Sequence, residues 1–307
     1  PAMRVVQMAG PALERCHVGA YNCAAHPIVD LFAFAELLYI LMQGSGNGFS
    51  VESDFISRLP RVKKQKKRRK VVQHAIPDNT EGWCDALHFG LKTWFDGGDV
   101  EFDYSLIRKK GTKLKTKGGR ASGPEPLKEL LTFVREVVLG SQGRRLTDLE
   151  VHDVCCMIGR IVQVGGVRRA ACISLSDIGS VAMRECKHGE WWNVAKQRSM
   201  ANNSAVYDYD ELPPIEVFME EWLALVKAKS GERGIFNRAA ARKCRPSRRK
   251  RSRFICNPCA EIILRPFQFC NLSIAVLRGH ETKEEMAAKV RAATMFGVLQ
   301  STATDFQ

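Results

Sequence analysis

Apolar residues recur every three or four positions in several long stretches of the chain, which is the spacing of one face of an α-helix. The first stretch covers residues 27–43, begins at a proline and is followed by Gly44. Because proline is tolerated in a first turn and glycine often follows a last one, these positions mark the ends of a predicted helix. By the same criteria further helices are predicted over residues 79–95, 125–139, 148–159, 216–228 and 281–300, the last of them amphipathic.

Short apolar runs separate these helices and have the length of strands. They lie at residues 49–51, 171–175, 254–259 and 262–264. The glycine-rich residues 44–48 follow a helix and lack the Lys-Ser or Lys-Thr pair of a phosphate-binding loop, so they predict a turn that leads into a strand. Helices that alternate with short strands predict an α/β fold, either a barrel or a large sheet covered by helices.

The net charge of +14 raises the question of nucleic-acid binding, and the position of the charge answers it. Two runs, at residues 63–70 and 242–253, hold 15 of the 47 Lys and Arg residues, which leaves 32 against 33 Asp and Glu. The remainder of the chain is therefore nearly neutral. We interpret the two runs as solvated loops; contact with nucleic acid is the alternative, although no aromatic residues interleave with the basic ones.

The chain begins at Pro1 without the apolar core of a signal peptide, and its longest apolar window is interrupted by charge, so neither secretion nor a membrane span is expected. We expect an internal fragment of a cytoplasmic protein. Its eleven cysteines are then mostly reduced thiols. Cys256 and Cys259 form the single Cys-x-x-Cys pair and no second pair completes a zinc site, so no metal site is expected and cysteine chemistry would be of a redox or radical kind.

The segment around Cys259 carries the strongest chemical signal. In an extended loop, period-two geometry would place Asn257, Cys259 and Glu261 on one side of the backbone. A thiol, a carboxylate and an amide that face one point can perform redox chemistry on a polar substrate, with the carboxylate moving a proton. The alternative is a buried cysteine in a proline-containing turn, with a solvated Glu261.

Residues 257–273, from Asn257 to Ser273, resemble the finger loop of ribonucleotide reductases, and in particular of the monomeric type that depends on adenosylcobalamin. Other segments resemble the same family in the same order; they lie at residues 9–15, 21–23, 38–42, 118–127, 165–169, 201–205 and 230–238. The chain departs from the family in its two basic runs and at Cys256, where the family tends to have a small residue.

The resemblance implies a role for five residues. Cys259 matches the cysteine that becomes a thiyl radical and removes hydrogen from C3′ of the ribose. Glu261 matches the base that deprotonates the 3′-hydroxyl, and Asn257 matches the residue that hydrogen-bonds the substrate's hydroxyls. Cys23 and Cys270 match the pair that reduces C2′ and ends each turnover as a disulfide. The alternative for this pair is two ordinary buried thiols.

The resemblance also implies allosteric control by a deoxynucleotide effector. A specificity loop at residues 165–171 would pass the identity of the effector to the active site. Its candidate residues are Gly165, Gly166, Val167, Arg168 and Arg169, because glycine permits close approach and arginine binds phosphate or base edges. A strand-to-helix turn with two solvated arginines is the alternative.

The expected fold is the first part of a ten-stranded α/β barrel of the ribonucleotide reductase type, incomplete because the family continues beyond the finger loop. Residues 1–50 would hold the first strands and Cys23. Residues 51–145 would form an effector-binding insertion, and residues 146–307 the barrel portion with the specificity loop and the finger loop at 254–273. A barrel left open would expose strand edges, so the fragment is expected to be inactive alone.

The resemblance therefore predicts a ribonucleoside-triphosphate reductase. It would act on ribonucleoside triphosphates by thiyl-radical chemistry, with adenosylcobalamin as cofactor, bound mostly outside these residues, and a thioredoxin-like reductant as partner. Two alternatives remain: a reductase large subunit that takes its radical from a separate subunit, and a basic protein that binds nucleic acid.

Overall fold

The computed structural model of the chain describes residues 3–65, 71–114, 119–162, 170–210 and 213–306. Its helices are α1 (Met3–Met8), α2 (Pro11–Arg15), α3 (Phe32–Met42), α4 (Ser53–Ile56), α5 (Thr80–Phe95), α6 (Glu125–Gly140), α7 (Asp148–Ile161), α8 (Val181–Glu185), α9 (Trp191–Val194), α10 (Ile215–Ala228), α11 (Arg238–Lys243) and α12 (Lys283–Gln300), with 3-10 turns at His17–Ala20 and Lys196–Met200. Its strands are β1 (Cys23–Ala25), β2 (Gly46–Ser50), β3 (Val71–Ala75), β4 (Asp99–Asp103), β5 (Cys172–Asp177), β6 (Ala201–Tyr207), β7 (Gly234–Asn237), β8 (Ile255–Cys256), β9 (Ile263–Leu264) and β10 (Gln268–Cys270).

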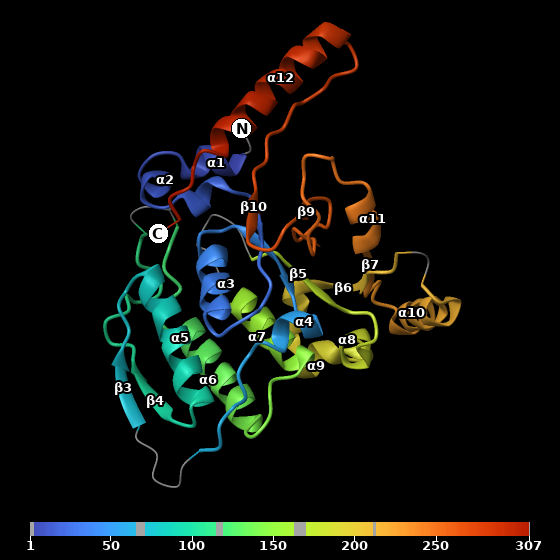
Figure 1. Ribbon diagram of the computed structural model, residues 1–307. Coiled ribbons are helices and arrows are strands. Elements are labelled where there is room, and N and C mark those ends of the chain that lie inside the picture. The colour runs from blue at the N-terminus through green and yellow to red at the C-terminus, as the bar shows by residue number, and fades with distance from the viewer. Residues whose placement is uncertain (1–2, 66–70, 115–118, 163–169, 211–212, 307) are drawn as a thin grey trace.

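A six-stranded sheet forms the centre of the molecule, with the strand order β10-β1-β2-β5-β6-β7 (Figure 1). From β1 to β7 neighbouring strands run parallel, and β10 joins the edge of β1 antiparallel. Parallel neighbours need long crossovers, which α3, α7 and the shorter helices supply. The mixed α/β class predicted from the alternation of helices and strands is confirmed.

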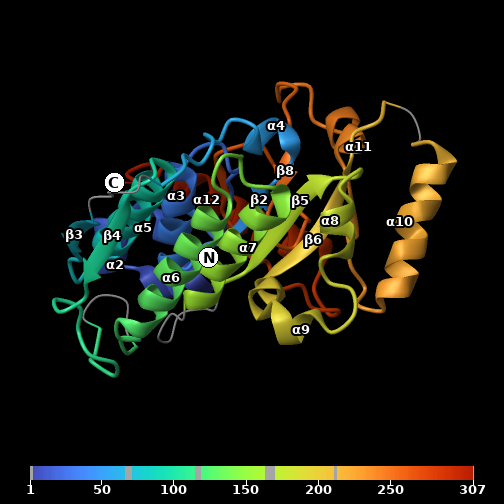
Figure 2. The same ribbon diagram turned by 90° about the horizontal axis from the view of Figure 1, so that it is seen from below.

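The two faces of this sheet are covered differently. Helices α3 and α7 lie against one face with α5 and α6 beyond them, and Phe49 and Cys172 point into the large core between these helices and the sheet (Figure 2). Because side chains alternate along a strand, the neighbours of these residues face the other way. There Ile173, Leu175 and Cys23 pack against β8, β9 and β10 in a second, smaller core.

A second unit lies beside the sheet. Strands β3 and β4 pair in parallel, and α5 connects them. The side chain of Asn79 caps α5 by accepting a hydrogen bond from the Gly82 amide at 2.6 Å, as its sequence position favours. The two strands were not predicted, because β3 alternates exposed and half-buried residues and carries too few apolar side chains to form an apolar run.

All six predicted helices form, and the differences occur at their ends. The first begins at Phe32 instead of residue 27, and the Asp30 carboxylate accepts from the Ala33 amide at 2.9 Å in its first turn. The predicted turn at residues 44–48 is shorter than expected. Strand β2 already begins at Gly46.

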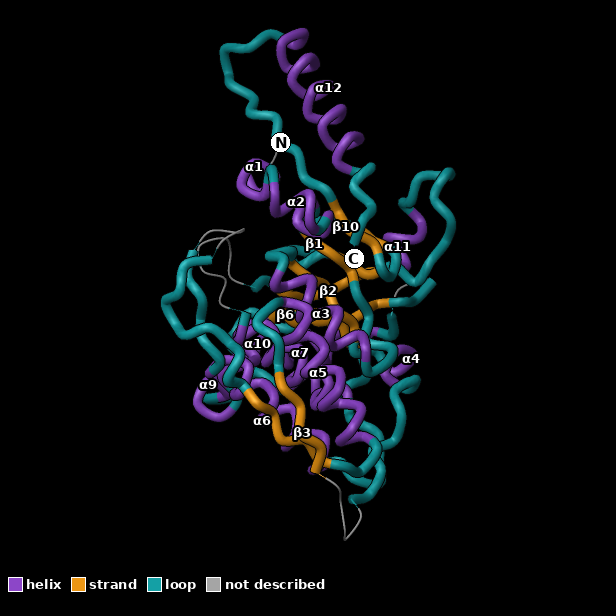
Figure 3. Tube along the Cα trace, turned by 90° about the vertical axis from the view of Figure 1, so that its left-hand side faces the viewer, coloured by secondary structure: helices purple, strands orange, loops and turns teal. Residues whose placement is uncertain are grey.

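Helix α12 projects away from the body of the molecule (Figures 1 and 3). None of its residues is buried, and Met295, Val298 and Leu299 are each more than 60% exposed, so the expected single apolar face does not form. In the part of the chain that the structure describes, the helices are all too short or too polar to cross a membrane.

Much of the basic run at 242–253 is an exposed loop, as its composition predicted, with Arg248, Lys250 and Arg251 on the surface. The run begins within α11, and two of its arginines form ion pairs with acidic residues near the ends of β6, β2 and α4. Arg242 pairs with Asp208, and Arg253 pairs with Glu52 at 3.1 Å and with Asp54. Part of the positive charge of the run thus complements acidic side chains of the same chain. In the other run, residues 66–70 lie outside the described residues.

Candidate active site

Cys23 and Cys270 lie directly opposite each other in the antiparallel pair β1–β10. Both are buried, at 1% and 9% exposure, and neither forms a disulfide. A hydrogen bond to the Cys23 thiol, reinforced by burial, raises the pKa of Cys270 well above its ordinary value. The Cys270 thiol is therefore held protonated and in contact with Cys23.

Aromatic packing supports the same strand pair at one end. Tyr21, just before β1, lies 5.2 Å from Phe269 of β10 between ring centroids, and Phe269 stacks on Phe306 at 5.0 Å. The Tyr21 hydroxyl donates to the carbonyl of Ala303 at 2.7 Å. These contacts join segments from both ends of the chain and fix the register in which the two thiols meet.

Asn257 connects this thiol pair to the segment that carries Cys259. Its side chain is 1% exposed, and its Nδ2 atom donates to the Cys23 sulfur at 3.8 Å. Its Oδ1 atom accepts from the Ile262 amide at 3.0 Å, and its carbonyl accepts from the Ala260 amide at 2.9 Å. One buried amide thus closes the turn and contacts a thiol at the same time.

Cys259 and Glu261 occupy the exposed side of this turn, whereas Asn257 and Pro258 are buried. The period-two arrangement expected for an extended loop is therefore wrong. The backbone folds back between Asn257 and Ala260, and Ala260 takes the left-handed conformation at φ 65°. Asn257 faces the interior while the thiol and the carboxylate face outward.

The carboxylate of Glu261 still acts on the buried thiols electrostatically. Burial raises the pKa of Cys256 to about 12, and the negative charge of Glu261 adds to this shift. The same charge contributes to the raised pKa of Cys270. Glu261 is thus close enough to influence the neighbouring thiols although its own side chain is exposed.

The arrangement has a definite chemical capacity. Two thiols in register can exchange with a disulfide, which is a two-electron redox couple. An exposed thiol and carboxylate lie on a turn anchored to one of them, so a polar molecule bound at the turn would be near both. Among the residues that the structure describes, no group of three or more His, Cys, Asp or Glu side chains is arranged to hold a metal ion.

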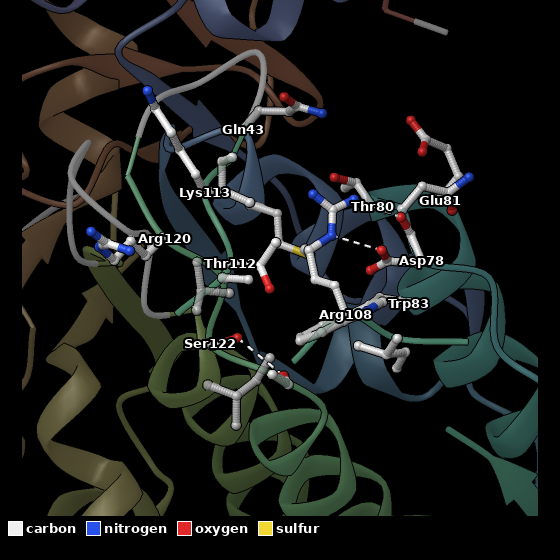
Figure 4. A pocket seen from close by; sticks show the side chains of 18 of the residues that line it. Gln43, Asp78, Thr80, Glu81, Trp83, Arg108, Thr112, Lys113, Arg120 and Ser122 are labelled. Carbon is white, nitrogen blue, oxygen red and sulfur yellow. Dashed lines mark hydrogen bonds and ion pairs between the residues drawn. The ribbon is translucent and has the colours of Figure 1, made fainter. Parts of the chain in front are cut away.

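A separate cavity of about 670 Å³ lies among α2, the end of α3, the start of α5 and the loop before α6 (Figure 4). Arg108 reaches Asp78 at 2.7 Å on one side of it, and Lys113 and Arg120 lie on the other. Arg120 donates to the carbonyl of Gly111 at 2.9 Å. Basic side chains outnumber acidic ones in its lining, which favours an anionic ligand.

No single residue of this cavity was assigned as a ligand from the sequence, because its lining comes from five separate segments. The predicted specificity-loop residues Gly165, Gly166, Val167, Arg168 and Arg169 lie outside the described residues. The chain leading to them is described as far as residue 162, and Ile161 and Val162 line the cavity.

The chain is similar to known proteins in sequence and in fold. A family model described as B12-dependent ribonucleotide reductase, insertion domain, matches residues 50–138. The adenosylcobalamin-dependent ribonucleoside-triphosphate reductase of Euglena gracilis is 31% identical over 231 residues, which cover 72% of this chain and 30% of that protein. The reductase of the same name from Lactobacillus leichmannii is 30% identical over 319 residues, covering 85% of this chain and 40% of that protein.

A crystal structure of a B12-dependent, class II ribonucleotide reductase superposes with a TM-score of 0.72. The match covers 94% of this chain and 48% of that chain at 24% identity, and it shows a shared fold. The chain spans 30% and 40% of the lengths of the two curated relatives above. The family resemblance stated from the finger loop is confirmed by these comparisons.

Proposed function

We propose that this chain, which its sequence and fold relate to the adenosylcobalamin-dependent ribonucleotide reductases, carries the thiol machinery that reduces ribonucleoside triphosphates to deoxyribonucleotides. The observation that carries the proposal is the register of Cys23 and Cys270, with Asn257 in contact with Cys23. Two thiols from distant parts of the chain meet beside the turn that holds a third, which is the set that such a reduction requires.

In the proposed reaction a thiyl radical on Cys259 removes the hydrogen atom from C3′ of the ribose. Glu261 accepts the proton of the 3′-hydroxyl, and the 2′-hydroxyl leaves as water. Cys23 and Cys270 supply two electrons and two protons and become a disulfide. Glu261 returns its proton to the 3′-oxygen, and the hydrogen atom returns from Cys259 to C3′. Each turnover thus oxidises two thiols and replaces one C–O bond by a C–H bond.

Adenosylcobalamin, which the relatives' names specify, would supply the radical. A corrin ring with its nucleotide and adenosyl arms is too large for either described cavity, of about 670 and 170 Å³. The residues around these cavities therefore do not fit the cofactor, and none of them is assigned to it. What this chain contributes is the thiol that carries the radical.

The cavity beside α5 is the proposed site of a deoxynucleotide effector. Its Lys113 and Arg120 suit a phosphate group, and Trp83 in its wall offers an aromatic surface for a base. It lies mostly within the residues matched by the insertion-domain model. The glycine-arginine loop at 165–169 would follow directly from the part of its wall formed by Val162.

The proposal extends to the architecture of the chain. Residues 1–50 and 146–307 would form part of a ten-stranded barrel, and residues 51–145 the effector-binding insertion. In support, the sheet is mostly parallel and its inner face packs against the turn of residues 254–264, as a loop inside a barrel would. The reductant would be a thioredoxin-like dithiol in the cytoplasm, where the eleven thiols stay reduced.

The test uses the full-length protein that carries this chain. Replacing Cys259 by Ala should abolish the reduction of ribonucleoside triphosphates and leave deoxynucleotide binding unchanged, because the thiol lies outside the cavity. Cys244→Ala is the matched control, since Cys244 is also exposed but lies outside the proposed site, and it should keep full activity. Retained reduction in C259A would overturn the proposal.

A further inference from the structure

We propose that Arg238 is a positioning residue, which fixes the backbone that leads into the turn of Asn257 and Cys259 and so sets where the Cys259 thiol lies. The inference deepens the proposed function and rests on it for its catalytic consequence. Its structural content, a buried arginine that holds a loop, does not depend on the reaction.

Arg238 is completely buried, at 0% exposure, at the start of α11. Its Nε atom donates to the carbonyl of Phe254 at 2.7 Å. Phe254 is the last residue before β8, and β8 leads directly to Asn257. The guanidinium therefore holds a main-chain atom, whose position sets the path of the residues that follow.

The other side of the same guanidinium is held by Glu52. The two terminal nitrogens of Arg238 donate to the two carboxylate oxygens of Glu52 at 2.7 and 2.6 Å, which is a bidentate pair. Burial alone would raise the pKa of Glu52, but Arg238, together with Ser50 and Arg253, lowers it below its ordinary value. Glu52 is thus held as an anion, and it follows β2 by two residues.

Strand β2 is also the surface on which the turn rests. A Cβ atom built on Gly48 would lie 1.8 Å from the carbonyl oxygen of Cys256, so the backbone of β8 lies directly on this glycine. Arg238 therefore anchors the turn to the same strand against which it packs. The strand supplies a contact at Gly48, and Glu52, two residues beyond its end, supplies an ionic anchor.

The basic run adds two further attachments. Arg253 pairs with Glu52 at 3.1 Å and lies over the ring of Phe55 at 5.2 Å, just before the turn. Arg249 donates at 3.1 Å to the side chain of Gln268, which follows the turn in the sequence. Arginines of residues 238–253 thus hold the segment on both sides of the turn, and Arg238 is the fully buried member of the set.

A buried ion pair is weak evidence for stability, because desolvation offsets much of the attraction. Arg238 differs from a purely stabilising member of an ion pair, because its Nε atom also donates to the main chain that leads into the turn. A matched pair exists elsewhere in the chain: Arg233 and Glu221 are also buried and bidentate, at 2.7 and 2.9 Å. Arg233 also donates to Ser176, Asp177 and Ile178, which all lie outside the turn.

The experiment compares R238Q with R233Q in the full-length protein by amide hydrogen exchange. The reporters are the amides of Asn257, Ala260 and Ile262, each hydrogen-bonded within the turn. In R238Q they should exchange about tenfold faster or more, because the turn opens locally without global unfolding. R233Q should leave them unchanged even where its loss of overall stability is similar. The double variant E52Q/R238Q leaves no unpaired buried charge, and it should reproduce the faster exchange if R238Q alone does not fold.

Equal acceleration in R238Q and R233Q, or unchanged exchange in R238Q and in E52Q/R238Q, would overturn the inference. Activity gives the second readout: R238Q should lower kcat about tenfold or more while substrate KM and effector affinity stay unchanged. If the full-length protein reduces no ribonucleotide, the proposed function fails, and the exchange data still decide the role of Arg238.

Discussion

Cys23 of β1 and Cys270 of β10 are direct cross-strand partners, although they come from opposite ends of the chain. Opposed residues in an antiparallel pair have Cα atoms about 4.5–5.5 Å apart, which lies within the range of about 4.4–6.8 Å found for disulfides. The two sulfurs can therefore join and separate without a change in the strand pairing. This is what a catalytic, reversible disulfide needs.

Mild oxidation with diamide should link Cys23 to Cys270 before the other buried cysteines form any bond. The physical reason is that their pairing is already set, whereas thiols such as Cys172 lie in the helix-side core. Mass spectrometry of peptides, with and without prior reduction, identifies the linked pair. Ser in place of either partner should remove the crosslink, while C172S should keep it; a crosslink dominated by other cysteines would contradict the assignment.

Gly48→Ala should destabilise the protein and displace the turn. The added Cβ would meet the Cys256 carbonyl at 1.8 Å, a contact with main chain that no side-chain rotation relieves. Overpacking of this kind costs about 1–3 kcal/mol. Urea denaturation of the variant and the wild type measures the change in the free energy of unfolding. Gly140→Ala is the control, because its Cβ would meet nothing within 4 Å, and it should stabilise by about 0.5–1 kcal/mol.

Glu150 should make stability fall in acid over a defined range. Burial would raise its pKa, but Arg144 and the amide and hydroxyl of Thr147 lower it from 4.5 to about 2. Because the pKa of Glu150 is lower in the folded state, its charge stabilises the fold at pH values above the ordinary pKa of 4.5. This contribution is lost as the pH falls from about 4.5 to about 2. Thermal unfolding of wild type and E150Q should differ at pH 7 and converge below pH 4.5. A difference that stays constant with pH would show that the charge plays no part.

The cavity beside α5 should lose affinity for deoxynucleoside triphosphates when its phosphate-facing side chains are neutralised. K113Q/R120Q removes two cations of the lining and should weaken binding about tenfold or more, as expected for charge-assisted contacts. Calorimetric titration measures the affinity. Lys92→Gln is the control on α5, because Lys92 is exposed and outside the lining. Equal weakening by both changes would indicate a general charge effect.

Local periodicity was enough to predict the helices, since a 3.6-residue repeat follows from one buried face and needs no knowledge of its partner. It gave α5 and α6 within one residue at each end, and placed α3 with a start five residues too early. It missed β3 and β4, which alternate too weakly, and it predicted an apolar face for α12, in which no residue is buried.

The candidate site divides in the same way. The residue types at Asn257, Cys259 and Glu261, and the family they resemble, were available from the sequence alone, because they lie within one short segment. Their geometry was not: the turn at Ala260 turns Asn257 inward and Cys259 outward, against the extended arrangement that spacing predicted.

Contacts between distant segments were decided only by the tertiary structure. The sequence contained Cys23 and Cys270 but no signal for their register, and it contained Arg238 and Glu52 without indicating that they pair. The cavity beside α5 likewise exists only where five segments meet. The physical reason is that residue type and local period are properties of neighbouring residues, whereas the pairing of strands and the burial of an ion pair depend on which distant surfaces the fold brings together.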